Sequence, residues 1–220
     1  MKNIATCYQL RFPDREIQSR RRLWSELCRY FQRYIPVKAT VMDIGAGYCE
    51  FINAIAARKK YAVDINPDTQ KFASPGVRVL ATDALAISKR FNGTIDRIFL
   101  SNFLEHLKTK EEVLAVLARV HGLLTGEGKL LILQPNIDLV KERYWDFFDH
   151  TVALNTRSLR EGLTIAGFVV EEFTERFLPY TTKSFLPASP MLLRLYLLLP
   201  EWLRPFAGQS FVVASKRQKG

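Results

Sequence analysis

Four apolar runs in the first half of this sequence each end in acidic or small polar residues that could hold a ligand. These residues are, in chain order, Asp43, Asp64, Asp83 and the pair Ser101 and Asn102. In a parallel sheet the carboxyl ends of the strands share one edge, and ligands bind just beyond that edge. Three acids in this order therefore favour a binding site over separate, solvated loop positions.

The first of these acids lies in a glycine turn with the sequence VMDIGAGYCEF. Gly45 and Gly47 tolerate backbone angles that other residues avoid, and they let a ligand approach the main chain closely. A dinucleotide site would place a third glycine beside a pyrophosphate, at the position where Glu50 stands. Because a carboxylate would repel a pyrophosphate, we expect a ligand that is neutral or cationic there. Asp64 lies about 20 residues after Asp43, a spacing typical of an acid that binds ribose hydroxyls.

Two histidines are candidate general bases, since the unperturbed pKa of histidine lies near neutrality. His106 follows Glu105 just beyond the fourth apolar run. His150 follows the aromatic segment YWDFFD, where Asp149 could orient it. Either histidine could instead be structural. The aromatic residues of this segment form either a platform for a sugar or aromatic ring, or a hydrophobic lid; they are Tyr144, Trp145, Phe147 and Phe148.

Strand and helix patterns alternate between residues 40 and 135, which predicts an α/β fold with a parallel sheet and helices on both of its faces. Strands are expected at 40–44, 61–66, 77–83, 95–102, 129–135, 168–180 and 209–216. Helices are expected at 15–35, 50–59, 84–91, 110–124 and 156–168.

Basic residues gather at both ends of the chain, whose formal net charge is +10. Residues 1–40 hold nine Lys and Arg against three acids, and residues 204–220 hold four and none. Basic ends suit nucleic acid, an anionic membrane surface or a phosphorylated substrate, although they could serve solubility alone. The apolar stretch 185–206 could lie on a membrane surface, cover the substrate, dimerise or bury itself.

The cysteines and the N-terminus favour a cytoplasmic protein. Cys7, Cys28 and Cys49 are widely spaced, without the spacing of a disulfide framework or a metal site. The first residues lack the apolar core of a signal peptide, so we expect no secretion.

Four segments resemble, in order, the signature segments of the class I S-adenosylmethionine-dependent methyltransferases: VMDIGAGYCEF, YAVDINP, LATDAL and RIFLSNFLEHL. The resemblance covers residues 40–134 best, and LREGLTIAGF is similar to the helix and turn before strand six of that fold. Longer stretches resemble an uncharacterised bacterial subgroup that is associated with polysaccharide and glycosyltransferase gene neighbourhoods.

The resemblance implies a doubly wound, Rossmann-like sheet of seven strands, mostly parallel with an antiparallel last strand. It implies S-adenosyl-L-methionine as cofactor and S-adenosyl-L-homocysteine as product, with no metal, because the sulfonium is already an activated donor. The acids Asp43, Asp64 and Asp83 would bind the cofactor's amino group, ribose and adenine in that order. The other implied cofactor-binding residues are Gly45, Ala46, Gly47, Ile65, Ala84, Ser101, Asn102 and Phe103.

One methyltransferase domain is then expected over residues 1–220. Residues 1–36 would contain the basic amphipathic helix, 37–180 the cofactor-binding core, 181–208 an apolar insertion and 209–216 the last strand.

Three functions stay open. The first is methyl transfer to an oxygen of a small molecule or saccharide, including a lipid-linked or phosphorylated glycan. The second is RNA methylation, favoured by the basic ends, and the third is a non-catalytic, cofactor-binding partner subunit. The segment QPN at 134–136 differs from the Asn/Asp-Pro-Pro-Tyr signature of amino-group methylation, which favours oxygen acceptors.

Overall fold

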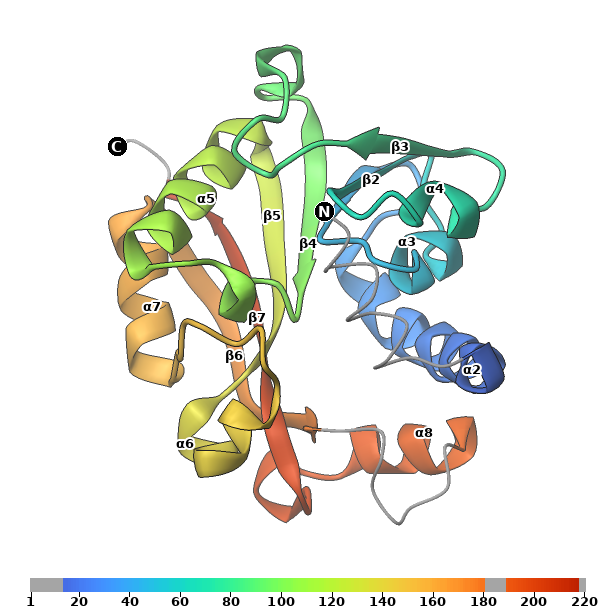
Figure 1. Ribbon diagram of the computed structural model, residues 1–220, viewed down its shortest axis with the longest axis vertical. Coiled ribbons are helices and arrows are strands. Elements are labelled where there is room, and N and C mark those ends of the chain that lie inside the picture. The colour runs from blue at the N-terminus through green and yellow to red at the C-terminus, as the bar shows by residue number, and fades with distance from the viewer. Residues whose placement is uncertain (1–13, 181–188, 218–220) are drawn as a thin grey trace.

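The computed structural model describes residues 14–180 and 189–217, and its centre is one sheet of seven strands (Figure 1). The strand order is β3-β2-β1-β4-β5-β7-β6. Strands β1 to β5 pair in parallel, and β7 runs antiparallel to both β5 and β6. This confirms the predicted α/β sheet. The strands are β1 (Thr40–Ile44), β2 (Lys59–Asp64), β3 (Val77–Ala81), β4 (Ile95–Ser101), β5 (Leu124–Pro135), β6 (Phe168–Pro179) and β7 (Ala207–Lys216).

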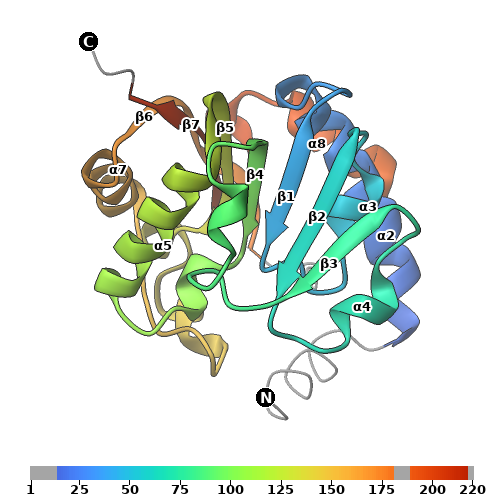
Figure 2. The same ribbon diagram turned by 90° about the horizontal axis from the view of Figure 1, so that it is seen from above.

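Helices cover both faces of the sheet. On one side lie α5 and α7, and on the other lie α2, α3 and α8 (Figure 2). The α-helices are α2 (Asp14–Phe31), α3 (Glu50–Ala54), α4 (Thr69–Phe72), α5 (Lys110–Leu123), α6 (Ile137–Val140), α7 (Thr156–Ile165) and α8 (Pro190–Leu198). The short 3-10 helices are η1 (Gln32–Tyr34), η2 (Lys89–Phe91), η3 (Leu104–His106), η4 (Lys141–Asp146) and η5 (Glu201–Leu203).

The helix predicted over 84–91 does not form, and only η2 appears there. The side chains of Ala84, Ile87 and Phe91 are all buried, which explains the helix-like spacing of apolar residues. Asp83 Oδ1, however, accepts a hydrogen bond from the Leu85 N–H, and this local turn competes with helix formation. The segment buries its apolar side chains in an irregular conformation instead.

Each face of the sheet buries its own apolar cluster, and β1 contributes to both. Met42 and Ile44 belong to the cluster beneath α5 and α7, whereas Val41 belongs to the cluster beneath α2 and α3. Successive side chains of a strand point to opposite faces. Asp43 therefore points with Val41 toward α2, so the carboxylate in the middle of an apolar strand lies beneath the N-terminal helix.

The amphipathic helix predicted near the N-terminus forms as α2 and is anchored by Phe31. This side chain is fully buried. Its ring centroid lies 5.1 Å from that of Phe211, 5.3 Å from that of Phe99 and 5.9 Å from that of Phe177. Strands β4, β6 and β7 thus all contact one side chain of α2.

Helix α8 and η5 contain the described part of the apolar stretch 185–206, of which residues 185–188 lie outside the described residues. Leu193 and Tyr196 pack against the cluster beneath α2, and Arg194 Nε lies 2.6 Å from Glu26 Oε1 of α2. The outward side chains are exposed and apolar; they are Met191, Leu195, Leu198, Trp202 and Phe206. The described part of this stretch is therefore only partly buried.

Among residues 14–180 and 189–217, no helix combines the length and the apolar character needed to cross a membrane.

Replacing Phe31 with alanine is expected to lower the free energy of unfolding by about 3–5 kcal/mol, because it leaves a cavity among three aromatic rings. Urea unfolding measures this change. The control is Arg22→Ala on the exposed side of α2, which should change stability by less than about 0.5 kcal/mol. Equal effects of the two substitutions would contradict the anchoring role of Phe31.

Candidate active site

The glycine turn after β1 is held in a conformation that only small residues allow. Gly45 has a φ of +77°, and a Cβ atom added there would lie 2.5 Å from Phe103 Cδ2. Gly47 has a φ of +50°, and its N–H donates to Asp64 Oδ2 at 2.7 Å. The turn is therefore fixed from both sides, by the ring of Phe103 and by the carboxylate of Asp64.

Cys49 takes the backbone conformation of a glycine. Its φ of 61° and ψ of 21° lie in the left-handed region, directly before α3. The side chain is fully buried, and Sγ lies 3.7 Å from the carbonyl oxygen of Thr69. A small, buried, non-glycine side chain thus occupies a backbone conformation that favours glycine, at some cost in backbone strain.

A cavity opens at the carboxyl end of β1 and β4, beneath α2. Most of its lining comes from the glycine turn and the end of β4, which include several of the residues named in the sequence analysis, and α2 adds two residues that were not named there. It is lined by Arg20, Trp24, Asp43, Gly45, Ala46, Gly47, Glu50, Phe51, Phe99, Ser101, Asn102 and His106. The sequence predicted the helix that contains Arg20 and Trp24. It did not predict that these two side chains lie over β1, because that depends on how the helix packs on the sheet.

Charge in this cavity differs from the expectation that rested on Glu50. Arg20 Nε donates to Glu50 Oε1 at 2.8 Å, so the Glu50 carboxylate is paired and does not by itself exclude a pyrophosphate. The preference for a cationic ligand group follows from Asp43 instead. It is 3% exposed, and burial, followed by the nearby carboxylates of Asp64 and Glu50, raises its pKa well above the usual range. A cation brought to Asp43 would offset this cost, so the cavity suits a cationic ligand group.

The remaining predicted cofactor residues surround the cavity without lining it. Asp64 is half-buried and accepts hydrogen bonds from the N–H groups of Gly47 and Asn66, each at 2.7 Å. Asp83 is exposed at the end of the neighbouring strand β3. The other three are Ile65, which is exposed, Ala84, which is buried, and Phe103, which is half-buried against Gly45.

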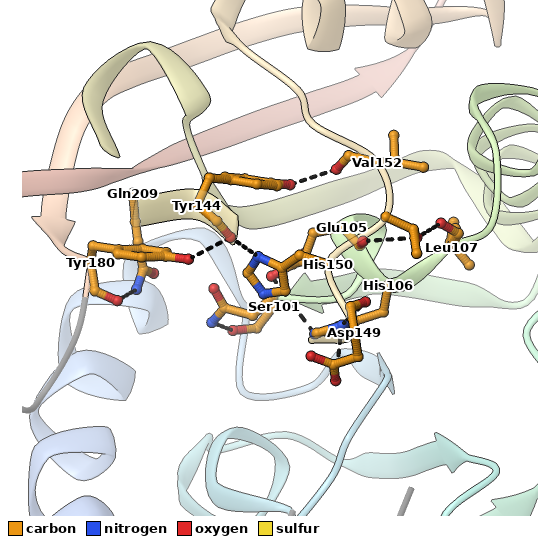
Figure 3. Close-up of polar contacts among 12 residues, drawn as sticks. Ser101, Glu105, His106, Leu107, Tyr144, Asp149, His150, Val152, Tyr180 and Gln209 are labelled. Carbon is orange, nitrogen blue, oxygen red and sulfur yellow. Dashed lines mark hydrogen bonds and ion pairs between the residues drawn. The ribbon is translucent and has the colours of Figure 1, made fainter. Parts of the chain in front are cut away.

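A second polar group lies beside the cavity, where η3 meets the segment 147–152. The N–H groups of Thr151 and Val152 donate to the carbonyl oxygen of Glu105 at 2.8 and 3.2 Å. These bonds bring together two histidines that are far apart in the sequence: the ring centroids of His106 and His150 are 5.0 Å apart (Figure 3). His106 also lines the cavity, so it connects the two groups.

Both histidines are oriented through Nδ1. His106 Nδ1 lies 3.1 Å from the carbonyl oxygen of Asp149 and 3.3 Å from its carboxylate. His150 Nδ1 lies 2.9 Å from the carbonyl oxygen of Tyr144. The sequence predicted that Asp149 orients His150; in the structure the Asp149 carboxylate also lies against His106, beside a turn in which the His150 N–H donates to the carbonyl oxygen of Phe147.

Glu105 is the residue of this group that the sequence analysis did not single out. It is fully buried, and neither carboxylate oxygen has a hydrogen-bond partner among the residues that the structure describes. Burial raises its pKa, and the nearby His106 and Gln134 offset part of that effect. One side-chain donor atom from each of Glu105, His106 and His150 lies within 4.8 Å of the other two.

The aromatic residues near His150 do not form a single platform. Tyr144 is fully buried, and its hydroxyl donates to the carbonyl oxygen of Val152 at 2.5 Å, so its role is structural. Phe147 packs against the ring of His150, with centroids 5.0 Å apart. Trp145 and Phe148 are exposed.

Comparison with known proteins defines the class. Residues 17–172 match a family model described as a methyltransferase domain. The chain therefore belongs to the class I S-adenosylmethionine-dependent methyltransferases, enzymes whose cofactor is S-adenosylmethionine. No curated protein matches the sequence.

Solved methyltransferases share the fold at low sequence identity. A S-adenosylmethionine-dependent methyltransferase from Archaeoglobus fulgidus is 24% identical with a TM-score of 0.61, over 86% of this chain and 93% of that chain. A Haloferax volcanii methyltransferase, in complex with the activator Trm112, is 14% identical with a TM-score of 0.68, over 94% of each chain. A Thermotoga maritima methyltransferase is 16% identical with a TM-score of 0.64, over 93% of this chain and 94% of that chain.

Replacing Asp43 with asparagine is expected to stabilise the ligand-free protein at neutral pH. The raised pKa means that the folded state binds more protons than the unfolded state, so wild-type stability falls as pH rises above the unfolded pKa of about 4 toward the folded value. The variant lacks this dependence. Its free energy of unfolding should exceed that of the wild type by about 1–3 kcal/mol at pH 8, and by less at pH 5.

Urea unfolding at several pH values measures this difference. Asp138→Asn, at an exposed position of α6, should follow the wild type at each pH. If Asp43→Asn gains no stability between pH 5 and pH 8, the Asp43 carboxyl is not destabilised by burial.

Proposed function

We propose that this methyltransferase transfers a methyl group to an oxygen atom of a small molecule or saccharide. The observation that supports this most directly is the position of His106, which lines the cavity of Asp43 and also contacts the group formed by Glu105 and His150. A methyl donor in the cavity would thus face side chains that can assist the loss of a hydroxyl proton.

Within the cavity, Asp43 would bind the amino group of the cofactor. The positive charge of that group would offset the cost of burying the Asp43 carboxylate. Asp64 would bind the ribose hydroxyls, and Asp83 the adenine. The remaining contacts would come from Gly45, Ala46, Gly47, Ile65, Ala84, Ser101, Asn102 and Phe103.

The cavity is small in the ligand-free chain. Its volume is about 80 Å³, whereas ligand pockets commonly measure about 300–1,000 Å³. Arg20 and Trp24 of α2 form its outer wall, so we expect these two side chains to move when the cofactor binds. The ion pair of Arg20 with Glu50 would then break or rearrange.

The proposed acceptor site lies against Glu105, His106 and His150, with Asp149 holding His106. Methyl transfer is an in-line displacement, and a hydroxyl must lose its proton during it, which explains why ionisable side chains are needed at this point. A phosphorylated or lipid-linked glycan is the saccharide class that best suits the basic chain ends and the exposed apolar residues of α8.

Replacing Asp64 with alanine should abolish measurable cofactor binding, because it removes both the ribose acceptor and the bond that holds Gly47. Gly45→Val should have the same effect, since its side chain would collide with Phe103. Calorimetric titration of S-adenosylmethionine measures both. Asp68→Ala is the control, because Asp68 is paired with Lys71 on α4, and it should bind like the wild type. Unchanged binding by Asp64→Ala would contradict the site.

The acceptor class is tested with methyl-labelled cofactor and mass spectrometry of the products. We expect label on hydroxyl oxygens of saccharides or other small molecules incubated with the full chain. RNA methylation is the alternative that the basic ends support, and label on RNA, together with salt-dependent RNA binding, would replace the present proposal. Cofactor binding without transfer to any acceptor would support a non-catalytic partner subunit.

We also propose that α8 and η5 contact a membrane surface, because their exposed side chains include Leu198 and Trp202, each 75% exposed. The full chain should sediment with vesicles that contain anionic lipid. Trp202→Ala should weaken the binding of the chain to these vesicles severalfold. Trp145→Ala, which removes an exposed tryptophan of η4 that belongs to neither α8 nor η5, is the control. If vesicles do not bind the chain, a protein partner is the better proposal, as in the activator complex of the Haloferax volcanii neighbour.

A further inference from the structure

We propose that Glu105, His106 and His150 form a binding site for a divalent first-row transition-metal ion, and that this ion holds the acceptor hydroxyl beside the methyl donor. The second half of this statement rests on the proposed function, whereas the metal site itself rests on the geometry of the three side chains. It also replaces the sequence-based expectation that the two histidines act as bases without a metal.

The three donor atoms lie close together. They are within 4.8 Å of one another. Nitrogen and carboxylate ligands bind at about 2.0–2.2 Å from an ion. Three donors around one ion are at most about 3.6 Å apart, so the longest separation would have to shorten by about 1 Å when the ion binds.

The neighbours of both imidazole rings indicate which ring nitrogen could bind an ion. The neighbours of His106 Nδ1 are the carbonyl and carboxylate oxygens of Asp149, and the neighbour of His150 Nδ1 is the carbonyl oxygen of Tyr144. These oxygens can only accept, so each Nδ1 carries the proton and each Nε2 carries the lone pair. His106 Nε2 lies 4.0 Å from Glu105 Oε1.

This arrangement of neighbours is typical of metal ligands. A metal-binding histidine usually donates its other ring N–H to a carboxylate or a backbone carbonyl, which fixes its tautomer and orientation. His106 has both kinds of acceptor in Asp149, and His150 has the carbonyl of Tyr144 (Figure 3). Asp149 is therefore a positioning residue: it would contact His106 rather than the ion itself.

Glu105 supplies an independent observation. Its side chain is fully buried, and within the described chain both carboxylate oxygens are without a hydrogen-bond partner. Burial of a carboxyl group without such partners costs several kcal/mol if it is ionised, and cores normally avoid it. A cation between Glu105 and the two imidazoles would remove this cost, and it would explain why an acid is placed there.

The donor set indicates the kind of ion. Two imidazoles and one carboxylate suit Mn²⁺, Fe²⁺, Co²⁺ or Zn²⁺, whereas Mg²⁺ prefers oxygen ligands alone. Three protein ligands leave at least one coordination position open for an exchangeable oxygen. His106 borders the cofactor cavity, so an oxygen in that position would lie on the side of the methyl donor.

The ion would activate the acceptor as a Lewis acid. Coordination lowers the pKa of the acceptor hydroxyl, which loses its proton to solvent. The resulting alkoxide then attacks the methyl carbon: an O–C bond forms, the C–S bond breaks, and its electron pair stays on sulfur, which leaves neutral S-adenosylhomocysteine.

Metal binding is tested on the full-length, tag-free chain after a chelator has removed bound ions. Co²⁺ alone is added while visible absorption is recorded, since ligation by protein nitrogen produces absorption bands that aqueous Co²⁺ lacks. One equivalent should bind, and Zn²⁺ should displace it. If the wild type produces no such bands, the proposal is wrong.

Variants assign the ion to these side chains. Glu105→Gln and His150→Asn keep the local shape and should each weaken Co²⁺ binding more than 100-fold. Asp149→Asn should weaken it about 10- to 100-fold, as is typical of outer partners. The control is His121→Asn: His121 lies in α5 against Phe168, and its loss should leave Co²⁺ binding unchanged.

Circular dichroism confirms that each variant is folded before it is titrated. Bands that persist at full strength in both Glu105→Gln and His150→Asn would place the ion elsewhere and overturn the proposal. Calorimetry with S-adenosylmethionine on the same samples separates the two proposals. Cofactor binding without Co²⁺ binding would reject the metal site alone, whereas Co²⁺ binding without methyl transfer to hydroxyls would support the metal site and reject the proposed acceptor class.

Discussion

Two buried carboxylates at the carboxyl edge of the sheet are the constraint on which the rest of this structure depends. Asp43 is 3% exposed and Glu105 is fully buried, and burial raises the pKa of both. Each placement opposes folding, so it has to be offset by the two apolar clusters on the faces of the sheet. A cationic group brought beside either carboxylate would offset this cost.

The two carboxylates are covered by parts of the chain that do not belong to the central alternation of strands and helices. Helix α2 lies over Asp43, anchored by Phe31, and its Arg20 pairs with Glu50. The segment 147–152 lies over Glu105 and is bonded to its backbone carbonyl. The central sheet and the η3 turn after β4 thus supply the acids and His106, the N-terminal helix supplies the positive charge of Arg20, and the segment before α7 supplies His150.

Much of the fold could be predicted because the relevant signals are local. The apolar runs of β1 and β4 and the helical spacing of α2 and α5 each involve residues close in sequence, and the boundaries agree within a few residues. The failure at residues 84–91 has a local cause as well. The spacing of apolar residues there matches a helix, but the turn made by Asp83 competes with helix formation. The spacing of apolar residues alone does not reveal that competing turn.

The sequence by itself determined the class of the protein: the glycine turn, the ordered acids and the strand–helix alternation together define a methyltransferase fold with a cofactor edge. Only the tertiary structure decided which side chains meet there. Arg20 reaches Glu50, the Asp149 carboxylate lies against His106, and Glu105 lies beside His150. These partners come from segments that are distant in the sequence, and periodicity carries no information about how distant segments pack.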